Sequence, residues 1–156
     1  MIYFKKVYFN YDDRANIEAA LRKVSLKRGR ELDWEPTNSN IGSDKYFLGH
    51  EGRDALTFAR LKSSIEILPK IIISLPKNPT DTYYKFRLAL FPFILYCIML
   101  LFLLVMIVSL ISGRSDFEGF IGGAFFPVLF IGLFFLELKL TSVMINKAIT
   151  KYKIIE

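Results

Sequence analysis

The chain has few of the residues that enzymes and metal sites use most. Among its 156 residues there is one cysteine, Cys97, and one histidine, His50. A single cysteine excludes an internal disulfide and a cysteine-based metal cluster. Gly42, Gly49 and Gly52 lack the spacing and the following Lys-Ser or Lys-Thr of a phosphate-binding loop. We therefore predict a protein that is not an enzyme and that has no catalytic residue, cofactor or metal site.

Charge is also nearly absent from a long part of the second half. Between residues 88 and 136 the only charged side chains are those of Arg114, Asp116 and Glu118. A helix rises about 1.5 Å per residue, so about 20 apolar residues cross a hydrocarbon core roughly 30 Å thick. Residues 88–112 carry no charge and exceed that length. Residues 120–138 have a shorter uncharged part, but the short 113–119 connection favours joint insertion of two helices.

Lysine and arginine flank these two stretches mainly on one side. Those before the first stretch and after the second are Lys70, Lys77, Lys85, Arg87, Lys139, Lys147, Lys151 and Lys153, against Arg114 in the connection. Basic residues near the ends of spans stay on the cytoplasmic side. We therefore predict a two-pass protein of the inner cell membrane with both termini in the cytoplasm. The predicted parts are a cytoplasmic α+β domain at 1–87, transmembrane helices at 88–112 and 120–138, an outward loop at 113–119 and a basic cytoplasmic tail at 139–156.

The second predicted span contains small residues and one carboxylate. Gly119, Gly123 and Ala124 have a small-x-x-x-small spacing, which would let a second helix approach closely in a homo-oligomer. Glycine is also common in membrane helices that make no such contact. Glu137 lies where the helix should reach the headgroups, just before Lys139, so we expect an interfacial, solvated carboxylate. The alternative is a role for Glu137 in oligomer contacts or along a water-filled path.

The first half has the pattern of a small sheet with one amphipathic helix. Residues 2–11 are rich in β-branched and aromatic side chains and predict a strand. From Arg14 to Gly29, apolar residues recur at three- and four-residue steps, which predicts a helix. Further strands are predicted at 46–48, 56–61, 65–68 and 70–75. The fold class is therefore an α+β membrane protein, with a cytoplasmic sheet and helix followed by a two-helix transmembrane hairpin.

Three local features complete the predicted soluble domain. Residues 36–43 form a turn-rich loop, and Trp34 just before it is expected to anchor that loop to the domain. His50 is expected in the turn between the strands at 46–48 and 56–61. After the last predicted strand, two prolines indicate a short, stiff connector that leads to the first span.

The predicted first helix carries a basic face. Its members are Arg14, Arg22, Lys23, Lys27 and Arg28. These side chains could rest on anionic lipid headgroups or meet an acidic partner, whereas a simply solvated face explains the same pattern. The net charge of +6 is spread over mixed-sign segments, and no nucleic-acid motif accompanies it. We expect the lipid bilayer and an unidentified cytoplasmic protein or small ligand as partners, and no nucleic acid.

Part of the chain resembles small uncharacterised bacterial membrane proteins. The shared pattern consists of Phe47, Gly49, Phe58, Arg60, Ser64, Pro69 and Ile71, then a two-span hairpin, then Phe134, Phe135, Glu137 and Leu138. It covers roughly residues 45–150. The resemblance implies a strand-rich cytoplasmic module attached to a membrane hairpin, and it implies no reaction, cofactor or catalytic residue.

Two functional hypotheses follow from these patterns. The first is a membrane-anchored interaction or sensing module that forms an oligomer, because basic residues flank the spans and small residues mark the second span. The second is a pore-forming or membrane-perturbing effector, for example in bacterial defence, that its cytoplasmic domain gates.

Overall fold

The first half of the chain forms a six-stranded sheet with the strand order β1-β6-β5-β4-β3-β2. The computed structural model describes residues 2–35, 45–61, 68–113 and 116–152. Neighbouring strands are antiparallel, except that β2 and β3 are parallel. The strands are β1 (Lys5–Tyr8), β2 (Ser25–Arg28), β3 (Phe47–Glu51), β4 (Ala55–Arg60), β5 (Ile71–Pro76) and β6 (Tyr83–Leu88).

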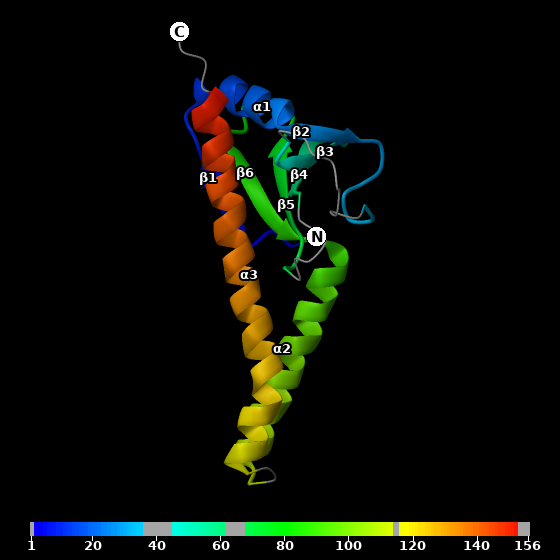
Figure 1. The fold of residues 1–156 in the computed structure, drawn as a ribbon, viewed down its shortest axis with the longest axis vertical. Coiled ribbons are helices and arrows are strands. Elements are labelled where there is room, and N and C mark those ends of the chain that lie inside the picture. Colours follow the sequence, from blue (N-terminus) through cyan, green and yellow to red (C-terminus); the bar gives the residue numbers. More distant parts are fainter. Residues whose placement is uncertain (1, 36–44, 62–67, 114–115, 153–156) are drawn as a thin grey trace.

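The helix α1 (Asp13–Lys23) covers one face of this sheet and connects β1 at one edge with β2 at the other (Figure 1). Ile17 and Leu21 are buried against this face, because their spacing places them on one side of the helix. Successive side chains of a strand point to opposite faces, so alternate residues of the strands point to this face, where α1 and the last helix of the chain pack. The main core on this face includes Phe47, Phe58, Ile73, Leu75 and Phe86.

Two long apolar helices follow the sheet. The helix α2 (Leu90–Ile111) begins just after β6 ends, and α3 (Phe117–Tyr152) returns alongside it (Figure 1). Both helices are long and apolar enough to cross a membrane. The 36 residues of α3 extend over about 54 Å at about 1.5 Å per residue. Its first part packs on α2, whereas its last part lies against α1 and β5.

The predicted α+β class with two long apolar helices is confirmed. The boundaries of the second helix differ from the prediction. Residues from 139 onward, predicted as a basic tail, continue α3 as far as Tyr152, because Ile145 and Ala148 are buried in the core that α3 shares with α1 and the sheet. The predicted loop at 113–119 is also shorter, since α3 begins at Phe117.

Two strands occupy positions that the sequence patterns assigned to other elements. Residues 25–28 were predicted as the end of the first helix but form β2, which pairs with β3. Residues 83–87 were predicted as connector and Leu88 as the first residue of a span, but residues 83–88 form β6, and α2 begins only at Leu90. His50 lies inside β3 and not in the turn that follows it. The predicted strand at 65–68 and loop at 36–43 fall largely or wholly outside the described residues.

The opposite face of the sheet carries a smaller apolar cluster. Leu48, Ala59 and Ile72 pack there around Leu32, which belongs to the segment that follows β2. Trp34 lies two residues further on and is 74% exposed. Trp34 thus does not pack its ring into the domain, and the loop that it was predicted to anchor lies outside the described residues.

Candidate functional site

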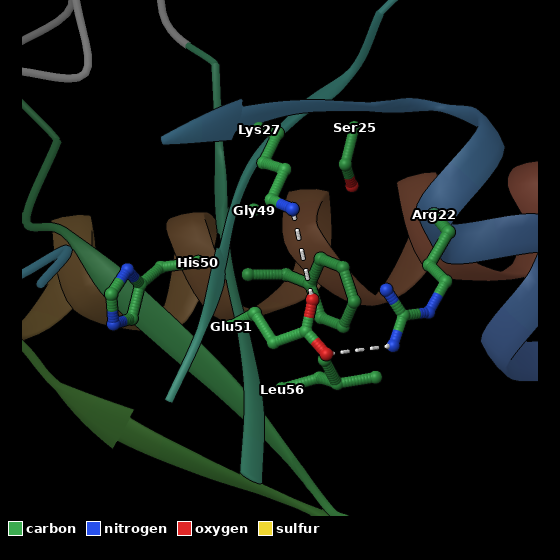
Figure 2. Close-up of a pocket in the computed structure, with 8 residues that line it drawn as sticks. Arg22, Ser25, Lys27, Gly49, His50, Glu51 and Leu56 are labelled. Atoms are coloured by element: carbon green, nitrogen blue, oxygen red, sulfur yellow. Dashed lines mark hydrogen bonds and ion pairs between the residues drawn. The ribbon is translucent and has the colours of Figure 1, made fainter. Parts of the chain in front are cut away.

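A pocket of about 110 Å³ opens between the C-terminal end of α1 and the strands β2, β3 and β4 (Figure 2). Leu56 and Phe58 of β4 form its apolar floor. Arg22, Lys27 and Glu51 form a charged rim. An apolar floor with a few convergent charges is typical of a binding site for a ligand or for the side chain of a partner.

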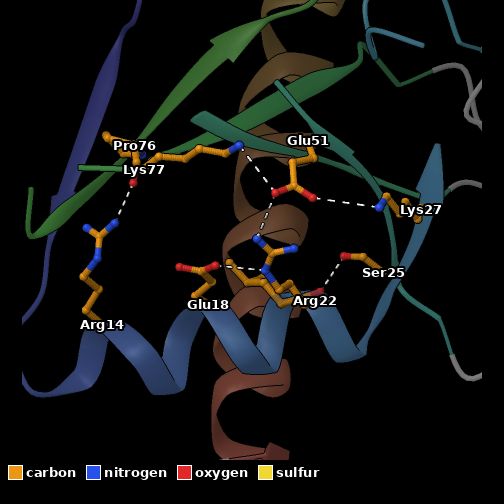
Figure 3. A network of polar contacts seen from close by, with 9 residues as sticks. Arg14, Glu18, Arg22, Ser25, Lys27, Glu51, Pro76 and Lys77 are labelled. Carbon is orange, nitrogen blue, oxygen red and sulfur yellow. Dashed lines mark hydrogen bonds and ion pairs between the residues drawn. The ribbon is translucent and has the colours of Figure 1, made fainter. Parts of the chain in front are cut away.

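Three cations converge on the carboxylate of Glu51 (Figure 3). Its oxygens lie 3.5 Å from Nη2 of Arg22, 3.9 Å from Nζ of Lys27 and 3.4 Å from Nζ of Lys77. Hydrogen bonds from Arg22 and Lys77, together with their charges, lower the pKa of Glu51. A hydrogen bond to Glu18 is the main cause of the raised pKa of Arg22, whose Nε lies 2.9 Å from the Glu18 carboxylate. Three cations thus face two carboxylates in this network.

The ion pairs of this network are weak enough to exchange partners. The side chains of Arg22 and Glu51 are 46% and 37% exposed, and Lys27 is more exposed still. Solvent-exposed ion pairs contribute about 0–1 kcal/mol each, because water screens them. An incoming anionic group could therefore replace Glu51 among the cations at little cost.

Strand β3 contributes a glycine that keeps the pocket open. A Cβ atom added at Gly49 would lie 3.1 Å from Cβ of Ser25 and 3.4 Å from the ring of Phe58. The glycine thus permits the close approach of β2 and leaves the pocket floor uncovered. The neighbouring His50 points away from the Glu51 cluster, as strand alternation requires (Figure 2). Its Nδ1 lies 3.3 Å from the carbonyl oxygen of Arg28.

The structure separates the basic residues that the sequence placed on one helix face. Arg22 and Lys27 line the pocket. Arg14 instead holds α1 on the sheet, because it donates hydrogen bonds to the carbonyl oxygen of Pro76 (Figure 3) and to that of Asp81. The remaining two have other surroundings: Nζ of Lys23 lies 4.5 Å from the centre of the Tyr152 ring, and Nε of Arg28 is buried without a hydrogen-bond partner among the described residues.

A buried ion pair joins the sheet to α3. Nε and Nη2 of Arg60 in β4 lie 3.2 and 2.7 Å from the two carboxylate oxygens of Glu137. The hydroxyl of Thr141, one turn further along α3, donates to the same carboxylate at 3.3 Å. The side chains of Arg60 and Glu137 are 7% and 0% exposed. The expected solvated carboxylate is therefore wrong, because α3 continues past the predicted interface and its Glu137 side packs on the sheet.

A second ion pair ties the sheet to the start of α2. The guanidinium of Arg87 in β6 lies 2.8 and 2.6 Å from the two carboxylate oxygens of Asp33. The backbone N–H of Leu90, at the first turn of α2, donates to the same carboxylate at 2.9 Å. Burial opposes ionisation of Asp33, but these hydrogen bonds and the charges of Arg87 and Lys70 outweigh it and lower its pKa. Asp33 thus caps α2 from a segment 57 residues away.

The small residues of the second span serve contacts within the chain. A Cβ atom added at Gly123 would lie 2.5 Å from the terminal methyl of Met106 in α2, so this glycine lets the two helices approach. Ala124 beside it is 8% exposed. The backbone N–H of Gly119 donates to the carboxylate of Asp116 at 2.9 Å, which stabilises the start of α3.

Sequence patterns missed the residues that complete these contacts. Arg60 was visible only as a single charge in a predicted strand, and Arg87 only as a basic residue before the first span. Their partners lie far away in the chain. No group of histidine, cysteine, aspartate or glutamate side chains in the described ranges has the arrangement of a metal site. No family model matches the chain, and comparisons with curated proteins and with solved structures find no match.

Proposed function

We propose that this chain is a membrane-anchored sensing module whose sheet domain binds an acidic partner group in the Arg22–Lys27 pocket. The observation that carries the proposal is the continuity of α3. One helix contains both a membrane-length apolar part and the buried Glu137 contact with the sheet. A helix that only anchored the domain would not need a buried ion pair with it.

The strand β4 connects the pocket to this helix. Leu56, Phe58 and Arg60 alternate along β4, so all three side chains point to the same face of the sheet. The first two form the pocket floor and the third holds Glu137. An anion that draws Arg22 and Lys27 together above this floor would therefore shift β4, and β4 also carries the Arg60 contact with α3.

The proposed location is the inner cell membrane, with both termini in the cytoplasm and the connection near Gly113 outside. The distribution of lysine and arginine supports this orientation. None of the described residues of α2 is buried, and its exposed side chains are mostly large and apolar, which suits lipid contact.

The same surface favours an anchor over a pore. Residues 90–111 carry no charged side chain that could line a water-filled path. The proposal also does not require the homo-oligomer that the glycine spacing predicted, because Gly123 already packs on Met106 within one hairpin. Dye leakage from vesicles that contain the protein would favour the pore instead.

The test uses Cys97, the sole cysteine, which is exposed on α2. A bimane fluorophore on Cys97 of the full chain in lipid nanodiscs reports on the hairpin while a tetraglutamate peptide is added. We expect saturable peptide binding that changes the bimane emission. The double variant Arg22→Gln/Lys27→Gln should weaken binding at least about tenfold, since two charge-assisted contacts are lost.

A second variant separates binding from coupling. The double variant Arg60→Met/Glu137→Leu removes the ion pair without leaving a buried charge, so it should leave peptide affinity unchanged and abolish the change in emission at Cys97. Equal affinity of wild type and the Arg22→Gln/Lys27→Gln variant would disprove the pocket. If the wild type binds the peptide without any change in emission, the pocket binds acidic groups but is not coupled to the hairpin.

A further inference from the structure

Trp34 is held in a fixed position with its indole exposed. Its side chain is 74% exposed, although Leu32 two residues before it is buried. Lys70 donates hydrogen bonds to the carbonyl oxygens of Leu32 and Glu35. The backbone N–H of Trp34 donates to the carbonyl oxygen of Glu31. The backbone on both sides of Trp34 is therefore tied to the sheet, and its exposure does not result from a loose chain end.

The same turn is attached to the beginning of the first apolar helix. Asp33, the residue before Trp34, caps the N–H of Leu90 and pairs with Arg87. Trp34 therefore lies beside the first turn of α2, at the end of the sheet from which the hairpin leaves.

Other large apolar side chains are exposed at this junction. Ile2 is 66% exposed and Phe91 is 75% exposed. Ile2 also lines an apolar crevice together with Leu88 and Leu90. Ile2, Trp34 and Phe91 thus form a set of exposed apolar side chains around the top of α2, which we name the collar.

We infer that the collar lies in the interfacial layer of the same bilayer that α2 crosses, so that the sheet domain rests directly on the lipid. This inference rests on the proposed membrane anchoring. Tryptophan is enriched at membrane–water interfaces, because its ring is apolar and its N–H needs a polar partner. Ile2 and Phe91 supply apolar area that water would otherwise cover.

The α1 end of the domain does not make this contact. Figure 1 shows α1 at the far end of the sheet from the start of α2. The basic side chains of Arg22 and Lys27 therefore face the cytoplasm in the proposed orientation, where a soluble acidic partner can reach them. The membrane surface and the pocket lie at opposite ends of the domain.

The experiment uses the fact that Trp34 is the only tryptophan of the chain, so intrinsic fluorescence excited selectively in tryptophan reports on the collar alone. The full chain is reconstituted into phosphatidylcholine vesicles whose acyl chains carry bromine either near the headgroup or near the chain end. We expect blue-shifted emission, a loss of emission with the shallow bromines that exceeds the loss with the deep ones, and little quenching by aqueous iodide.

Bimane on Cys97 in the same vesicles controls for insertion of the hairpin. Quenching of Cys97 by the deep bromines, with Trp34 quenched by iodide and by neither lipid, would overturn the collar and leave the membrane anchoring intact. Quenching of neither probe by lipid would overturn both proposals. A Trp34 shielded from iodide and from lipid alike would show that protein covers it, which also contradicts the inference.

A matched control moves the tryptophan to the other end of the domain. Tyr11 is 64% exposed just before α1. In the variant Trp34→Phe/Tyr11→Trp, we expect red-shifted emission that iodide quenches and that neither brominated lipid affects. Similar lipid quenching at both positions would mean that the domain lies flat on the vesicle, contrary to the collar geometry.

Discussion

The two apolar helices look alike in composition but have different roles in the structure. None of the described residues of α2 is buried, whereas α3 buries residues along much of its length, from Ala124 to Ala148. α2 ends where its apolar stretch ends, and α3 continues onto the sheet. The comparison teaches that α2 is an apolar helix of membrane length with little contact to the sheet, whereas α3 combines a membrane-length apolar part with a segment that belongs to the core of the sheet domain. Changes on α3 should therefore disturb the domain far more than changes on α2.

The largest effect is expected from the buried ion pair. Glu137→Gln leaves Arg60 buried without a charged partner in that pair, which should destabilise the domain by about 3–5 kcal/mol. Denaturant unfolding in detergent micelles, followed by circular dichroism, measures this loss. The control is Arg60→Met/Glu137→Leu, which replaces both charges with apolar groups and should be close to wild type. Equal stability of the wild type and Glu137→Gln would show that the pair does not hold α3.

The next effect distinguishes two sides of the same helix turn on α3. Ile145 is fully buried, and Val143 is 53% exposed. Ile145→Ala should lower the free energy of unfolding by about 2–4 kcal/mol, because it leaves a cavity against the sheet. Val143→Ala should change it by less than about 0.5 kcal/mol. Similar losses in both variants would contradict the docking of α3 in this register.

A smaller, pH-dependent effect is expected at the start of α2. Asp33→Asn removes the charge that pairs with Arg87 and caps Leu90, and it should lower the free energy of unfolding by about 2 kcal/mol. Because the folded-state pKa of Asp33 is lowered, its contribution is fully present above its ordinary pKa of about 3.9 and is lost as the pH falls through the folded-state pKa. Unfolding measured from neutral to acidic pH should show the two proteins converging in acid. A difference in unfolding free energy that stays constant with pH would mean that the charge of the Asp33 carboxylate does not stabilise the start of α2.

The smallest effect is expected between the two helices. Gly123→Ala forces the methyl of Met106 to move and should cost about 1 kcal/mol. Gly122→Ala is the control, because no described heavy atom lies within 4 Å of the added Cβ, and it should be neutral or slightly stabilising. The double variant Gly123→Ala/Met106→Ala should recover part of the loss. Equal effects at the two glycines would contradict the observed face of contact.

Hydropathy was sufficient to find both apolar helices, because a long uncharged run is a local signal. It was insufficient to find the docking of α3, since Glu137 and its partner Arg60 are 77 residues apart. The short strand β2 was taken for the end of a helix, and the prolines before β6 hid that strand. In each case a partner lies far away in the chain: Arg60 for α3, β3 for β2, and β1 on the outer side of β6.

The candidate site was predicted only in part. Arg22 and Lys27 were recognisable as basic positions, although both were assigned to one helix face and Lys27 lies in β2. Glu51 and Lys77 were not, because the sheet brings them to the pocket from other strands. Trp34 was expected to pack on the domain, but its side chain is exposed. A single tryptophan before a loop has no sequence signal that distinguishes the two environments.

The central claim is that the pocket and the hairpin are coupled through α3. Amide hydrogen exchange of the full chain in nanodiscs, with and without saturating tetraglutamate peptide, tests it most directly. The account predicts altered exchange in β4 and in α3 around Glu137 and Thr141 upon peptide binding. A change confined to α1, β2 and β3 would contradict it.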